Sequence, residues 1–264
     1  MKKILPILAL LFLLCSPTIV FAHDLLPMQI VEYLSAHPEA TPEEIELYAK
    51  TLDPETAKKF SNTEEVIRMV RDQKTNVWDN AWDFLVLGIK HILSGLDHIL
   101  FVLSMLLVFA STAELLRLTS TFTIAHSITL FLAGAGLFTL SPRIAEPFIA
   151  LSIAFMAIAT VLFGRHKFIN DGWGKIGIIF FFGLFHGFGF AGLLKEIAIP
   201  KDKFVSSLLG FNIGIEVGQI IIIAFVLPFI FAYRKKSWYP LCIKFIAVAI
   251  SILALFWFIE RVFF

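Results

Sequence analysis

The sequence has little cysteine and little charge for its length, and both shortages exclude classes of protein. Its 264 residues include two cysteines, Cys15 and Cys242, which are too few for a disulfide scaffold or a thiolate zinc cluster. The 22 basic and 21 acidic residues nearly cancel, which excludes a basic nucleic-acid-binding protein. The sequence also contains no Walker-type phosphate loop, so nothing in it supports direct ATP hydrolysis.

What the chain has in excess is apolar residues. They make up 58% of the sequence, while charged residues make up 16%, against about 25% in soluble domains. The mean hydropathy is +0.83, and 29 residues are Phe. A soluble fold of this size cannot bury that much apolar surface. The composition therefore predicts a protein whose solvent is a lipid bilayer.

The first 22 residues have the pattern of a cleaved export signal. Two lysines precede a short apolar run, and Val20-Phe21-Ala22 is the kind of sequence that signal peptidase cuts. Cleavage leaves a mature chain that begins at His23. An uncleaved first membrane span is the alternative, and two prolines near or within the run argue against it.

Residues 23–82 differ in composition from the rest of the chain, with twelve acidic and six basic residues. Thr41-Pro42-Glu43-Glu44 is a capping box with proline at the first helical position, and further helix starts are expected at Asp53 and Asn62. The segment predicts three or four short exported helices with an acidic, solvated surface. Such a surface suits the concentration of divalent cations or the docking of a periplasmic protein partner.

Six apolar stretches follow, each near or above the roughly 20 residues that a membrane helix needs. Basic residues are concentrated after the first, third and fifth stretch, so these loops are expected in the cytoplasm and the mature N-terminus in the periplasm. The predicted fold is all-α: a signal peptide (1–22), a helical exported region (23–82) and a polytopic six-helix transmembrane bundle (83–264). The stretches are about 84–109, 116–140, 145–164, 174–194, 204–232 and 240–260.

Ionisable side chains within these spans are the candidate site, because they are costly in hydrocarbon and usually functional. Counting about 1.5 Å per residue puts five of them within roughly 3 Å of the bilayer midplane. His91 lies about 8 Å farther out, and about 10 Å from His98 along a straight helix, so one ion reaches both only if Ser94-Gly95 opens the helix. The five mid-membrane groups are Asp97, His98, His126, His186 and Glu216.

Together with His91, these five residues are the predicted metal ligands. Imidazole combined with carboxylate suits nickel, cobalt, zinc, copper or iron, and it is a poor set for magnesium or calcium. A purely structural role, in which a histidine hydrogen-bonds to another helix, is the alternative and applies most to His126.

Glycines at four-residue spacing flank two of the candidates, which favours close helix packing in lipid. The sequence therefore predicts that the fourth and fifth spans pack against each other with the site between them. The glycines are Gly183 and Gly187 around His186, and Gly210, Gly214 and Gly218 beside Glu216.

Four stretches taken together resemble the HupE/UreJ family of hydrogenase and urease accessory membrane proteins. The resemblance covers residues 83–262 and implies uptake of nickel or cobalt across the bacterial inner membrane. It implies metal contacts from His91, Asp97, His98 and His186. Residues 188–191, which follow the Phe-His-Gly motif, contain no acidic residue. In this respect the chain looks like the second branch of the family. The stretches are 88–101 with His-x5-Asp-His, 122–130, 185–191 with Phe-His-Gly, and 210–216.

The leading interpretation is a permease for a divalent metal ion, with the ion as substrate and no organic cofactor. The acidic region and His91 would gather the ion, and the mid-membrane groups would hold it. Two alternatives stay open. One is an intramembrane metal-dependent hydrolase assisted by Ser94 or Glu216, and the other is a metal-linked accessory protein whose exported helices bind a partner.

Overall fold

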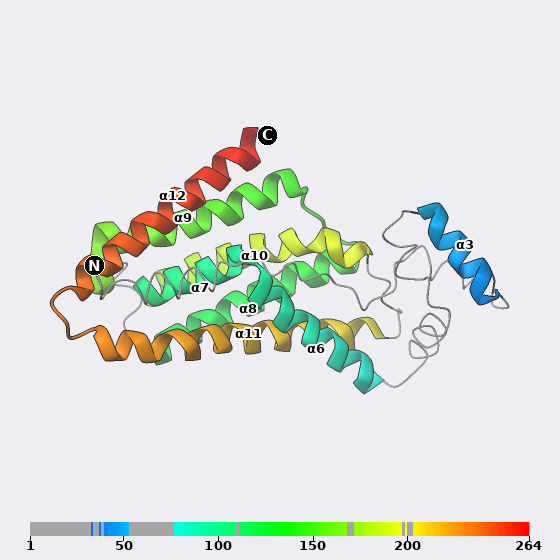
Figure 1. Cartoon of the computed structure of the whole chain (residues 1–264), viewed down its shortest axis with the longest axis horizontal. Coiled ribbons are helices and arrows are strands. Elements are labelled where there is room, and N and C mark those ends of the chain that lie inside the picture. The colour runs from blue at the N-terminus through cyan, green and yellow to red at the C-terminus, as the bar shows by residue number, and fades with distance from the viewer. Residues whose placement is uncertain are drawn as a thin grey trace.

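The computed structural model describes residues 33, 37, 40–52, 77–108, 111–167, 172–196, 199 and 203–263. All regular elements in these ranges are helices (Figure 1). The predicted signal peptide and the helix starts expected at Asp53 and Asn62 lie outside the described residues. The helices are α3 (Pro42–Leu52), α6 (Val77–Ser94), α7 (Leu96–Val108), α8 (Thr112–Gly134), α9 (Pro142–Lys167), α10 (Gly172–Glu196), α11 (Phe204–Tyr233) and α12 (Tyr239–Phe263).

The described helices confirm an all-α polytopic membrane fold. Helices α8 to α12 are each long and apolar enough to cross a bilayer. Helices α6 and α7 pass the same test only together, as a bent pair that forms either a broken span or a re-entrant loop. This pair differs from the single helix that was predicted for the first span. It begins earlier, at Val77, and it consists of two helices that meet at Gly95 with a bend of 70°.

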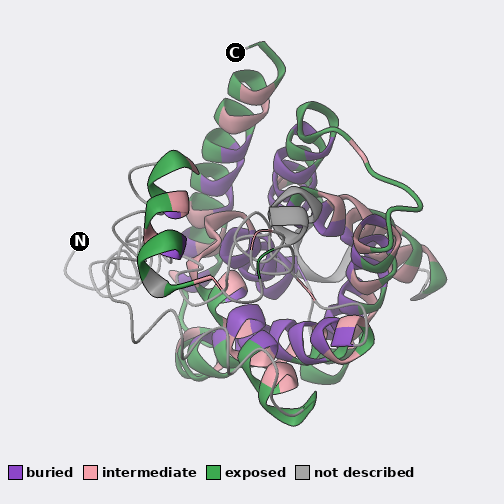
Figure 2. Ribbon diagram, turned by 90° about the vertical axis from the view of Figure 1, so that its right-hand side faces the viewer, coloured by how far each residue is buried: buried purple, intermediate pink, exposed green. Residues whose placement is uncertain are grey.

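Helix α7 lies at the centre of the bundle. All its residues from His98 to Val108 are buried, and it packs against α9 and also touches α6, α8, α11 and α12. A helix that is apolar on all sides is stable only when other helices surround it. The helices turn their buried residues inward and their exposed residues outward (Figure 2).

The outer surface is apolar, as expected for a protein in lipid. Exposed side chains on α12, for example, include Leu241, Phe245 and Ile252. Exposed tryptophans mark both ends of the bundle, with Trp78 at the start of α6 and Trp173 at the start of α10. Tryptophan is enriched at both membrane interfaces, so the two positions are consistent with the edges of the bilayer.

Glycines hold two pairs of parallel helices in close contact. A Cβ atom on Gly214 of α11 would lie 2.1 Å from the carbonyl oxygen of Leu85 on α6. A Cβ atom on Gly187 of α10 would lie 2.5 Å from the carbonyl oxygen of His126 on α8. The expected packing of the fourth span on the fifth through these glycines is therefore wrong. Spacing alone indicates that a helix has a close neighbour, and it does not identify the neighbour.

The predicted capping box at the start of α3 is present. The backbone N–H of Thr41 donates to Glu44 Oε2 at 2.7 Å, and the backbone N–H of Glu44 approaches Thr41 Oγ1 at 3.4 Å. The Thr41 hydroxyl also donates to the same carboxylate at 3.0 Å. These bonds satisfy backbone donors that have no partner inside the helix.

The capping box predicts a pH dependence of α3. Hydrogen bonds from the Thr41 backbone, and then from its hydroxyl, lower the pKa of Glu44 below the ordinary 4.5. Because the folded-state pKa is lowered, the stabilisation is present above the unfolded-state pKa and is lost as the pH falls through the folded-state pKa. We expect an NMR titration of the Glu44 carboxyl carbon to show a midpoint below 4.5 and Thr41→Ala to raise it. Equal midpoints in the two proteins would contradict this role of the Thr41 hydroxyl.

Candidate functional site

The break between α6 and α7 brings two histidines together. The backbone N–H of Gly95 donates to His91 O, and the Gly95 carbonyl accepts from Ile99 N, each at 3.0 Å. One helix therefore ends and the next begins at this residue. The ring centroids of His91 and His98 lie 4.5 Å apart, whereas a straight helix would separate the residues by about 10 Å. The helix is thus open at Ser94-Gly95, which was the condition for one ion to reach both histidines.

Two more imidazoles approach this pair, and we call His91, His98, His126 and His186 the histidine cluster. The ring of His126, on α8, lies 6.2 Å from His91 and 6.3 Å from His98, centroid to centroid. The ring of His186, on α10, lies 5.3 Å from His98. His98 thus contacts the other three rings. The structure brings together four of the six side chains that the sequence nominated.

The histidine cluster is enclosed by phenylalanines. Phe190 and Phe211 pack on His91, with ring centroids 4.2 and 5.6 Å away. Phe101 and Phe122 each lie 5.0 Å from His186. An environment of aromatic rings excludes water and strengthens any electrostatic interaction within it.

Six ring nitrogens in the histidine cluster are buried and, among the described residues, have no hydrogen-bond partner. Neutral imidazole carries one N–H donor and one lone pair, and a buried polar group without a partner costs about 1–3 kcal/mol. Groups of this kind need an explanation in a native protein, and a cation-binding role is one. The nitrogens are His91 Nε2, both nitrogens of His98, both nitrogens of His126, and His186 Nδ1.

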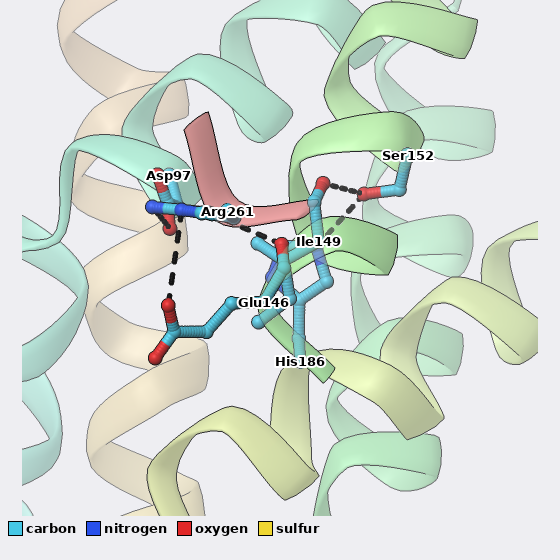
Figure 3. A network of polar contacts seen from close by, with 6 residues as sticks. All are labelled: Asp97, Glu146, Ile149, Ser152, His186 and Arg261. Atoms are coloured by element: carbon cyan, nitrogen blue, oxygen red, sulfur yellow. Dashed lines mark hydrogen bonds and ion pairs between the residues drawn. The ribbon is translucent and has the colours of Figure 1, made fainter. Parts of the chain in front are cut away.

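His186 is oriented by a serine that the sequence analysis did not nominate. Ser152 Oγ on α9 lies 3.0 Å from His186 Nε2 and donates to Ile149 O at 2.6 Å (Figure 3). Since the hydroxyl has one hydrogen and the Ile149 carbonyl takes it, the hydroxyl accepts from His186 Nε2–H. His186 Nδ1 then carries the lone pair. A serine in the middle of an apolar span was the available signal.

Two ring separations in the histidine cluster suit a shared metal ion, although the described side chains do not form a ligand set. No three His, Cys, Asp or Glu side chains in the described part of the chain are arranged as ligands of one metal ion. Imidazoles bound to one tetrahedral ion through bonds of about 2.0–2.1 Å have centroids about 5 Å apart. The distances from His98 to His91 and His186, 4.5 and 5.3 Å, bracket that value.

Asp97 lies in a different network, although it is next to His98 in the chain. Its Oδ2 is paired with Arg261 Nη2 of α12 at 3.0 Å. Arg261 Nη1 also donates to the carbonyl oxygen of Glu146 on α9 at 3.2 Å (Figure 3). The sequence does not indicate this network, because Arg261 looks like a surface charge at the end of the last span.

Glu216 also lies apart from the histidine cluster, in a polar layer between α8 and α11. Its carboxylate accepts a hydrogen bond from Ser120, and Thr123 donates to Gln219 Oε1 at 3.0 Å. Ser120 precedes His126 by six residues, which is about 9 Å along α8. Counting residues from the span centres therefore grouped Glu216 with the imidazoles, but the structure does not bring them into contact.

Comparison with known protein families shows which family this chain belongs to. The family model described as HupE / UreJ protein matches residues 67–261. The chain belongs to the HupE/UreJ family. The matched range contains the break, the histidine cluster, Glu216 and Arg261, and it begins before α6, within the segment predicted to be exported. No curated protein and no solved structure matches the chain.

Proposed function

We propose that this HupE/UreJ protein is a permease for a divalent transition-metal ion. Nickel and cobalt are the substrates that we favour. The observation that carries the proposal is the buried histidine cluster, with its unpaired ring nitrogens, at a helix break inside a membrane bundle. Broken membrane helices form the ion sites of many transporters, because the helix ends expose backbone groups there. The metal ion is the substrate.

The donor chemistry supports this choice of substrate. Imidazole nitrogens suit nickel, cobalt, zinc and copper, whereas magnesium and calcium prefer oxygen ligands. HupE/UreJ membership points in the same direction, since the family is associated with nickel and cobalt handling. Because the four imidazoles carry no compensating carboxylate among them, the bound ion keeps a positive charge that favours onward movement.

The path we propose starts at the end of the bundle where α6 and α11 begin. The acidic segment that precedes α6 faces the periplasm and attracts the ion. The ion passes the break into the histidine cluster and continues to the Ser120–Glu216 layer, where a carboxylate is the next ligand. A divalent ion moving inward across the bacterial inner membrane gains about 4.6 kcal/mol per 100 mV, so the membrane potential suffices to drive uptake.

The hydrolase hypothesis receives less support from the contacts. Ser94, one of the groups it would use, donates to Lys90 O at 2.7 Å. Glu216, the other, is bonded to Ser120 in the separate polar layer. Both side chains therefore form hydrogen bonds with groups outside the histidine cluster.

The test is metal uptake by the full chain in liposomes. Purified protein is reconstituted, an inside-negative potential is set with potassium and valinomycin, and trapped metal is measured by mass spectrometry. We expect saturable, potential-dependent entry of nickel or cobalt and no entry of magnesium. Uptake no faster than in protein-free liposomes would overturn the proposal.

A further inference from the structure

Three helices meet at the Arg261 guanidinium, beside the break. Arg261 belongs to the last turn of α12, Asp97 to the first turn of α7, and Glu146 to the start of α9. Arg261 Nε also lies 4.0 Å from Glu146 Oε2, and the guanidinium lies 5.5 Å from the centroid of the Trp257 ring. Figure 3 shows the side chain between Asp97 and Glu146.

These contacts fix the guanidinium at several points. Arginine presents its donors in a rigid planar fork, so bonds to Asp97 and to the Glu146 carbonyl orient the group together. The side chains of Arg261 and Asp97 are each 22% exposed, so solvent screens the pair less than it would a surface pair. The first turn of α7 is thereby attached to α9 and α12.

The same pair makes Asp97 a poor ligand for a cation. Its carboxylate already neutralises a guanidinium. To bind a divalent ion it would have to leave Arg261, and the unpaired guanidinium would then repel the incoming ion.

The position of Asp97 relative to His98 suggests another role. Successive side chains of an α-helix point about 100° apart. When Asp97 is held against α12, the rotation of the first turn of α7 is fixed, and His98 points toward His91 and His186. The distances from His98 to those rings, 4.5 and 5.3 Å, depend on that rotation.

We propose that Asp97 is a positioning residue whose ion pair with Arg261 aims His98 into the histidine cluster, and that it does not bind the metal. The inference rests on the proposed function. It assigns the two charged residues a shared role that spacing in the sequence does not reveal.

The first test is the affinity of Arg261→Ala for Co²⁺, measured with the full chain in detergent. If Asp97 is a positioning residue, this variant binds about tenfold more weakly than wild type, as loss of an orienting partner usually does. If Asp97 is a ligand, removing its competitor leaves the affinity unchanged or raises it. That second outcome would overturn the proposal.

A spectroscopic measurement separates the roles independently of affinity. The visible absorption bands of bound Co²⁺ report the ligand set. We expect Asp97→Asn, which keeps an acceptor oxygen for Arg261, to give the wild-type spectrum. A changed spectrum in Asp97→Asn would show that the carboxylate coordinates the ion.

Charge exchange provides the rescue experiment. Asp97→Arg and Arg261→Asp should each lose most Co²⁺ binding, and the double variant should recover it, because an arginine at position 97 restores the pair but cannot bind a cation. Size-exclusion profiles identify variants that fail to fold, and in that case the spectrum of Asp97→Asn decides between the two roles.

The wild-type protein distinguishes failure of this inference from failure of the proposed function. Wild type that binds no Co²⁺ would overturn both, whereas wild type that binds Co²⁺ without transporting it would overturn the proposed function alone.

Discussion

His98→Ala is expected to abolish stoichiometric nickel binding and to slow uptake by at least about 100-fold, since even outer partners of a metal ligand cost 10–100-fold. His98 is the one ring in contact with the other three members of the histidine cluster, at 4.5, 6.3 and 5.3 Å. Its removal leaves His186 without the imidazole that joins it to His91 and His126, whose rings lie 6.2 Å apart. The measurement is metal content by mass spectrometry together with the initial rate of uptake in liposomes.

The loss should not reflect unfolding. His98 is buried, and neither of its ring nitrogens has a hydrogen-bond partner among the described residues. Alanine therefore breaks no hydrogen bond of this side chain, and it removes two unpaired polar atoms from the bundle interior. The matched control is His37→Ala, since His37 is an exposed histidine outside the bundle. If His98→Ala bound nickel at the wild-type stoichiometry, the histidine cluster would not be part of the transport path.

The depth of the three mid-membrane histidines was predictable from the sequence. Residues near the centres of separate spans come to the same level, so His98, His126 and His186 could be grouped by counting residues. Depth does not give the direction in which a side chain points around its helix. Asp97 faces α12, where Arg261 binds it, and Glu216 faces α8, where Ser120 binds it about 9 Å along that helix from His126.

Other contacts follow from tertiary packing alone. Ser94-Gly95 was the place where the helix had to open for one ion to reach both histidines, but the 70° bend depends on how α6 and α7 pack on different neighbours. Arg261 and Asp97 are 164 residues apart, and no local pattern links them. The glycines of α10 and α11 predicted close contact correctly, but they gave no information about which helix lies opposite.

The second large effect is expected for Gly95→Ala, which adds one methyl group at the break. A Cβ atom there would lie 2.7 Å from His98 Nδ1 and 2.9 Å from the His91 carbonyl oxygen. Both distances are shorter than van der Waals contact, so the His98 ring or the end of α6 must move. Alanine also favours a continuous helix over glycine by about 1 kcal/mol, which opposes the bend. We expect nickel uptake to fall at least about tenfold, as for loss of an orienting group.

Gly177→Ala is the control that separates this local effect from a general intolerance of larger residues. Gly177 lies within α10, and a Cβ atom on it would meet nothing within 4 Å. Its substitution should leave uptake unchanged and stabilise α10 slightly, because alanine is the better helix former. If Gly95→Ala also transported at the wild-type rate, the close approach of His91 and His98 would be dispensable. The ion would then have to pass the bundle without the native approach of the two rings, because the added methyl group forces the His98 ring or the end of α6 to move.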